Sequence, residues 1–282
     1  MTCLFTLPRS GKHYKLLPCV YFCVLQFFTW LTFRMLSFKL YPSYIPLYAT
    51  IHGLFWLVLG YLVAVYYDHV QPFVPFVSAL GIYPPEQYMF MCLMGSYGVM
   101  MIISQWFWCS MMMKKFRRKS FSIVGQYTCI FVALLYTIAG ICIVLLSFFN
   151  MKDTNQFHYE LSMINFYCHV IVIPLSLLLI ICVFRPWKWF LLARILVACQ
   201  LLLGSYFFVY YNWIGNMVFA GSNFFYIREY EPGYVEFNKC AFSEWLAIFS
   251  LLEITLITGL ELRNHEIQNE ETNHDIYAIL AA

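Results

Sequence analysis

Long apolar runs separated by short polar or basic segments dominate this chain. About 20 consecutive apolar residues suffice to cross a bilayer as a helix. Six such runs are found, at 46–67, 88–113, 121–149, 161–184, 190–213 and 240–262. The segments between them leave little room for a soluble domain. The pattern therefore predicts an all-α fold, a polytopic membrane protein built as a bundle of six transmembrane helices.

A seventh, shorter apolar run extends from Leu16 to Phe33 and has basic residues on both flanks. No small-residue cleavage site follows it, so it does not read as a cleaved signal peptide. We expect an interfacial or re-entrant helix there, with a seventh span as the alternative. The expected organisation is a cytoplasmic or interfacial extension (1–45), a six-span domain (46–265) and a cytoplasmic tail (266–282).

The basic residues are distributed unevenly between the two faces of the membrane. If six runs span and both ends are cytoplasmic, then 14 of the 17 Lys and Arg residues lie on the cytoplasmic side. Only Lys152, Arg228 and Lys239 fall on the other side. Because cytoplasmic loops carry an excess of basic residues, the sequence predicts cytoplasmic termini and a luminal loop at 69–86.

Composition narrows the function classes. The chain is 62% hydrophobic and only 11% charged, whereas a soluble domain carries about 25% charged residues. No basic tail or glycine-rich phosphate loop occurs, which argues against nucleic-acid and nucleotide partners. The cysteines lie mostly inside apolar runs without metal-type spacing, and no Ser/His/Asp set or HExxH motif occurs. We therefore expect no metal, no cofactor and no enzymatic activity.

Polar residues inside the fourth run follow one helical stripe. Ser162, Asn165, His169 and Ser176 are spaced by 3, 4 and 7 residues, which places them on one face of a helix. That face should contact protein or water rather than lipid. Hydrogen bonding between helices is the more common reason for such a stripe, and a ligand or proton site is the alternative.

The last run carries two acidic residues, Glu244 and Glu253. Nine residues at about 100° each place them on opposite faces of a helix, so they cannot form one acid/base pair. Glu244 is expected in the first helical turn, where the helix dipole favours an anion. Glu253 lies deeper and should be neutral or paired, with His52 and His169 as candidate partners.

The loop between the first two runs, residues 68–86, contains four prolines. Proline removes a backbone donor and restricts the residue before it, so a helix cannot pass through this loop. The loop is nevertheless apolar and aromatic, unlike a solvated linker. We expect a compact cap that packs on the helix bundle at the membrane surface.

Two motifs carry a resemblance to a known family. The loop resembles the signature loop of the damage-regulated autophagy modulator (DRAM) family through His69, Pro72, Phe73, Pro75, Ser78, Gly81, Pro84, Pro85 and Glu86. The late segment Ser243-Glu244-Trp245 resembles the start of that family's final helix. The resemblance covers about residues 46–265. Ala79 and Leu80 depart from it, because the family loop typically carries Asp and Thr there.

The resemblance implies an endolysosomal membrane protein that promotes autophagy by binding partners or membrane lipids rather than by catalysis. The wider six-span group includes proteins linked to remodelling of GPI-anchor lipids and to phosphoinositides, so a lipid-handling role is the alternative. Golgi or plasma membrane residence is the alternative location. A lipid-sized groove lined by Glu253 or His169 would favour lipid handling, and a filled bundle would favour the regulator.

The tail contains one short sorting motif. Tyr277 and Leu280 fit the tyrosine-x-x-bulky-apolar signal that clathrin adaptors bind. Adaptors bind such motifs as extended peptides. The acidic, polar segment from Asn269 to Ala282 is expected to be disordered and therefore accessible, so a clathrin adaptor is a candidate partner.

Overall fold

The computed structural model describes residues 41–117, 122–183, 188–219 and 227–281. Within these ranges the chain forms six long α-helices and the short 3-10 helix η1 (Ser78–Gly81), with no strand. The long helices are α2 (Tyr44–Tyr66), α3 (Glu86–Arg117), α4 (Ser122–Leu146), α5 (Asn155–Val183), α6 (Lys188–Val218) and α7 (Tyr234–Ala281). Each includes a stretch long and apolar enough to cross a membrane. The expected six-span, multi-pass membrane fold is confirmed, while the run at 16–33 lies outside the described residues.

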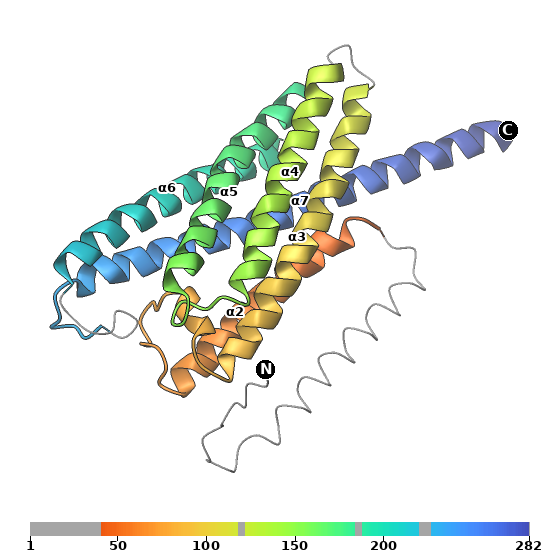
Figure 1. The fold of residues 1–282 in the computed structure, drawn as a ribbon. Helices are drawn as coiled ribbons and strands as arrows, with labels where there is room; N and C mark the ends of the chain where they lie inside the picture. The colour runs from red at the N-terminus through yellow and green to blue at the C-terminus, as the bar shows by residue number, and fades with distance from the viewer. Residues whose placement is uncertain (1–40, 118–121, 184–187, 220–226, 282) are drawn as a thin grey trace, which may run out of the picture. The chain divides into compact units, whose positions relative to one another are not determined.

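The six helices follow one another around a closed ring, in which each contacts its neighbours along the chain and α7 contacts α2 (Figure 1). The α3–α4 and α6–α7 pairs share the longest interfaces. By contrast, α5 and α6 meet over only a few residues, and Figure 1 shows the two helices diverging with distance from the end of α5 and the start of α6. The contact between helices that follow one another in the chain is therefore smallest between α5 and α6.

The alternating helix directions give this ring two distinct ends. At the basic end α3 and α5 end and α4 and α6 begin, with Lys114, Lys115 and Arg117 in the last turn of α3. At the cap end α2, α4 and α6 end and α3, α5 and α7 begin, and the loop at 67–85 joins α2 to α3. The assignment of the basic end to the cytoplasm remains a prediction.

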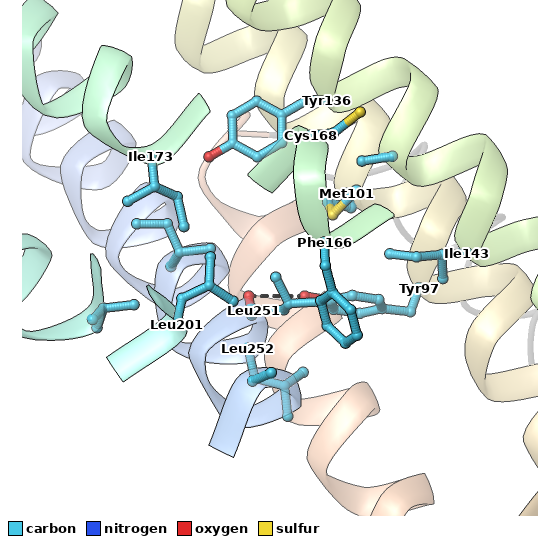
Figure 2. Packing of buried hydrophobic residues seen from close by; sticks show 14 of the residues in the cluster. Tyr97, Met101, Tyr136, Ile143, Phe166, Cys168, Ile173, Leu201, Leu251 and Leu252 are labelled. Carbon is cyan, nitrogen blue, oxygen red and sulfur yellow. Dashed lines mark hydrogen bonds between the residues drawn. The ribbon is translucent and has the colours of Figure 1, made fainter. Parts of the chain in front are cut away.

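Neighbouring helices of the ring pack closely against one another. A Cβ atom at Gly98 of α3 would lie 2.8 Å from the Gly140 carbonyl oxygen of α4, so only glycine allows this approach. Figure 2 shows Tyr97 and Phe166 grouped together and Tyr136 in a separate part of the buried cluster. In the same view the Tyr97 hydroxyl donates a hydrogen bond to the Leu251 carbonyl at 3.0 Å. A buried hydroxyl in an apolar core needs such a partner.

The final helix differs most from the sequence-based expectation. It runs without interruption from Tyr234 to Ala281, so the expectation of a disordered segment from Asn269 onward is wrong for the backbone. Tyr277 and Leu280 lie in its last turns, and their side chains lie outside the described residues. A continuous helix satisfies its own backbone groups, so adaptor binding in an extended form would require this segment to unwind.

Candidate functional site

The loop at 67–85, here called the cap, packs on the helix bundle as its apolar composition predicts. Residues 75–82 are all buried, and their only regular element is η1. A Cβ atom at Gly81 would lie 2.7 Å from the Phe90 ring, so glycine lets the cap approach α3 closely. By contrast, the Phe73 side chain is 67% exposed, and the Pro84–Pro85 peptide bond is cis.

A buried carboxylate on α7 holds the cap in place. Glu244 accepts hydrogen bonds from the backbone N–H of Val77 at 2.7 Å, from the backbone N–H of Ser78 at 3.3 Å and from the Ser78 hydroxyl at 2.9 Å. Hydrogen bonds to a carboxylate are stronger than neutral ones. Because α7 begins at Tyr234, Glu244 lies nearly three turns inside the helix, and its expected first-turn position is wrong.

An aromatic pair beside Glu244 completes the attachment. The Trp245 indole N–H donates to the Pro75 carbonyl oxygen at 2.7 Å. The Tyr61 ring packs edge-on against Trp245, and its hydroxyl donates to the Pro72 carbonyl oxygen at 2.6 Å. Ser243 is also buried on α7 and donates to the Lys239 carbonyl oxygen. The two sequence motifs thus form one contact surface, with Glu244 and Trp245 of one motif bonded to residues of the other.

The far side of the cap carries a second acidic contact. His69 Nδ1 lies 2.5 Å from Glu86 Oε1, and the His69 ring packs between Tyr67 and Tyr83. Glu86 is fully buried in the first turn of α3, where the helix dipole favours an anion. This pair fixes the cap where it enters α3.

Beneath the cap lies a narrow chamber, with a volume of about 70 Å³ for the centres of water-sized molecules. All six helices contribute to its wall, which is mostly apolar and includes Tyr97, Ile143, Phe166, Leu251 and Leu252, the residues grouped around Phe166 in Figure 2. Its polar side chains are Ser78 of the cap, Tyr97 of α3, Glu244 of α7 and four residues of α5, namely His158, Tyr159, Ser162 and Asn165. The chamber is therefore an apolar space with a polar rim.

The polar stripe of α5 faces the protein interior, as its spacing predicts. Ser162 and Asn165 line the chamber, and Ser176 is buried. His169 is fully buried below them, where its Nδ1–H donates to the Asn165 carbonyl oxygen at 2.9 Å. Asn165 Oδ1 is buried without a hydrogen-bond partner among the described residues. Asn165 thus lines the chamber and has an unused acceptor, whereas His169, whose Nε2 also lacks a partner among the described residues, does not line it.

The candidate partners of Glu253 are not its partners. His52 hydrogen-bonds with Ser96 at 2.7 Å, and His169 is engaged as described above. Glu253 is partly exposed and hydrogen-bonds to Gln200 of α6 instead. Neither Glu253 nor His169 lines the chamber. Of the residues that the sequence analysis singled out, Ser78, Asn165 and Glu244 do line it.

The basic end holds a buried ion pair that the sequence analysis did not identify. Arg194 of α6 donates through Nε and Nη2 to both carboxylate oxygens of Glu261 on α7, at 2.7 and 2.6 Å. The Trp108 indole N–H of α3 donates to the same carboxylate at 2.7 Å. The available signal was a basic and an acidic residue within apolar runs, since such residues usually pair inside a bundle.

Comparison with known proteins gives one match. The model of the Frag1/DRAM/Sfk1/Cwh43P N-terminal domain matches residues 41–265, a range that contains the cap, the chamber and the ion pair. No curated protein and no solved structure matches at the significance required. The match is to the broad family and does not separate its DRAM branch from the others. The chain belongs to the Frag1/DRAM/Sfk1/Cwh43P family of membrane proteins.

Proposed function

We propose that this protein resides in endolysosomal membranes and regulates autophagy by binding a lipid in the chamber beneath the cap, rather than by catalysis. The observation that carries this proposal is the chamber itself, an apolar space lined by Asn165, whose Oδ1 has no hydrogen-bond partner among the described residues. A buried polar atom without a partner costs free energy. A ligand that supplies the missing hydrogen bond would recover that cost.

The engagement of the neighbouring polar groups supports binding over chemistry. Glu244 is bonded to the cap. His158 Nδ1 donates to the Phe149 carbonyl oxygen at 2.6 Å, and Ser162 donates to the His158 carbonyl oxygen at 2.9 Å. A catalytic acid or base must be free to exchange a proton with its substrate. These groups instead have structural partners, which suits a binding site.

The proposed location rests on the resemblance of the cap to the DRAM signature loop and on the tail motif. Tagged wild-type protein should colocalise with late endosomal and lysosomal markers. Replacing Tyr277 by Ala should shift the protein to the cell surface if an adaptor binds the motif. Lysosomal localisation unchanged by Tyr277→Ala would place the targeting signal elsewhere, and residence of the wild type in the Golgi would contradict the proposal.

Asn165→Leu tests lipid binding, and Gln105→Leu is its matched control. Both variants remove a buried amide that has an unpartnered atom, but only Asn165 lines the chamber. Full-length protein would be purified from membranes and its bound lipids identified by mass spectrometry. We expect a lipid that co-purifies with the wild type and Gln105→Leu but is depleted several-fold in Asn165→Leu. Equal lipid content in all three proteins would contradict binding in the chamber.

The same variants connect binding to autophagy. In cells lacking the endogenous protein, the wild type and Gln105→Leu should restore autophagic flux, whereas Asn165→Leu should not. Comparable membrane levels of the three proteins are the control for folding. Full rescue by Asn165→Leu despite lost lipid binding would separate the chamber from the autophagy role.

Lipid remodelling is the second candidate function, favoured by one observation. Glu244 and His158, a carboxylate and an imidazole, both line the chamber, and such groups can move protons when a substrate changes their contacts. Purified protein incubated with membrane lipids would then release or exchange acyl chains over time. Lipid profiles that remain constant during incubation would exclude turnover of the lipids supplied.

A further inference from the structure

The chamber's polar rim is rich in unused hydrogen-bond acceptors. Because His158 Nδ1–H donates to a backbone carbonyl, the Nε2 atom of the neutral ring carries a lone pair. The Ser162 hydroxyl proton is directed at the His158 carbonyl oxygen, which leaves its oxygen lone pairs. Asn165 Oδ1 has no hydrogen-bond partner in the part of the chain that the structure describes. A group that donates hydrogen bonds is thus complementary to this rim.

The Glu244 carboxylate adds to this preference. It lines the same chamber and is almost fully buried. A carboxylate or phosphate entering the chamber would lose its hydration beside the Glu244 carboxylate and the acceptors named above, with only the neutral donors of Tyr159 and Asn165 on the wall to offset this loss. Burying a charge without a partner is far more costly than burying a neutral group. The rim therefore disfavours anionic head groups.

Size restricts the ligand further. A volume of about 70 Å³ for water-sized centres is several times the ~10–15 Å³ that one water molecule needs. A hydroxyl or amino head with a few methylene groups fits this space, whereas a phosphodiester head group with its hydration does not. The remaining chain must leave the chamber. Contact between helices that follow one another in the chain is sparsest between α5 and α6, where the buried rings of Phe166 and Phe208 meet on the chamber wall. A chain that leaves the chamber on this side would have to displace these two rings.

We propose that the chamber binds the head and first carbons of a single-chain lipid whose small head donates hydrogen bonds, a long-chain alcohol or amine, and that it excludes the corresponding carboxylic acid. This inference rests on the proposed function, because it names the lipid class that the chamber accepts. An alcohol can also accept from the Asn165 side-chain N–H group while donating to an acceptor on the rim.

Photoaffinity labelling of the purified full-length protein in lipid nanodiscs tests the inference. Three probes of equal chain length would carry a photoreactive group near the head and differ only in the head, which is an alcohol, an amine or a carboxylic acid. Labelled peptides would be identified by mass spectrometry. We expect the alcohol or the amine to label chamber residues on α5 and α7, and the acid to label them about tenfold less, equivalent to about 1.4 kcal/mol.

Variants and outcomes separate this inference from the proposed function. Asn165→Leu should reduce chamber labelling by the alcohol or amine several-fold, and Gln105→Leu should not. Labelling by only one of the two identifies which head group the chamber accepts and supports the inference. Equal labelling by the acid would overturn the head-group preference and leave lipid binding intact. Absence of chamber labelling by all three probes would overturn both.

Discussion

The two ends of the helix bundle use buried carboxylates in different ways. At the cap end, Glu244 satisfies backbone N–H groups of a loop, and a chamber remains beside it. At the basic end, Glu261 is bonded to Arg194 and Trp108 from two other helices, and neither Arg194 nor Glu261 lines that chamber. The basic end joins helices to one another, whereas the cap end joins a loop to helices around a space. Ligand-dependent movement is therefore expected at the cap end.

The largest effect is expected from Glu261→Leu. This variant leaves the Arg194 charge buried without its partner, a change that costs about 3–5 kcal/mol in other proteins. The double variant Arg194→Met/Glu261→Leu removes both charges and should be closer to the wild type. Thermal unfolding in detergent would measure both. The control is Arg263→Met, since Arg263 lies in a more exposed pair with Glu266 and should cost less than about 1 kcal/mol.

If the single and double variants were equally stable, the ion pair would not hold the basic end together, and the contrast between the two ends would fail.

A smaller effect is expected from Glu244→Leu at the cap end. The backbone N–H groups of Val77 and Ser78 would lose their acceptor, at a cost of about 2 kcal/mol within the usual range for buried unpaired groups. Glu244→Gln keeps one acceptor oxygen and should fall between Glu244→Leu and the wild type. Limited proteolysis within residues 67–85 would report release of the cap. A cap equally resistant to protease in all three proteins would show that other contacts suffice to hold it.

Trp245→Phe should have a still smaller effect. Phenylalanine keeps the aromatic contact with Tyr61 but removes the N–H that donates to Pro75, which is worth about 1 kcal/mol. Trp189→Phe is the matched control, because Trp189 is 77% exposed. Thermal stability should fall for Trp245→Phe alone. Equal thermal stability of the two variants would show that Glu244, and not the Trp245 N–H group, holds the cap.

The smallest effect is expected from Glu253→Leu, midway between the two ends. Glu253 is partly exposed and bonds to Gln200. The Gln200 amide also donates to the Leu246 carbonyl oxygen at 3.4 Å, so Glu253→Leu leaves Gln200 with a partner and should cost little. A double-mutant cycle with Gln200→Leu should give a coupling below about 1 kcal/mol. A large coupling would add a third buried contact of structural importance to the two ends.

The sequence predicted the six spans and the buried stripe of α5, because hydrophobic periodicity is a local property. It did not predict contacts between residues far apart in the chain. Ser78 and Glu244 each stood in a motif, but their separation of 166 residues concealed that the motifs touch. The Arg194–Glu261 pair likewise depends on how α6 meets α7.

The sequence analysis also misplaced the start of the last helix. α7 begins at Tyr234, before the apolar run at 240–262 starts, because a helix can continue through polar residues outside the hydrocarbon core. The resulting error placed Glu244 at a helix end, where a dipole explanation was sufficient, instead of at a cap contact. Cavities were beyond sequence reasoning for the same reason as long-range contacts, since their walls come from all six helices.

The continuity of α7 connects the cap contact to the segment of the same helix that extends beyond the bundle. Its 48 residues span about 72 Å at 1.5 Å per residue, more than twice the ~30 Å hydrocarbon core of a bilayer. The same helix thus carries Glu244 under the cap, Glu261 in the ion pair and Glu266. Glu266 accepts hydrogen bonds from Ser43, which precedes α2. A partner that binds the protruding segment and rotates it would apply torque to the cap contact without touching the cap.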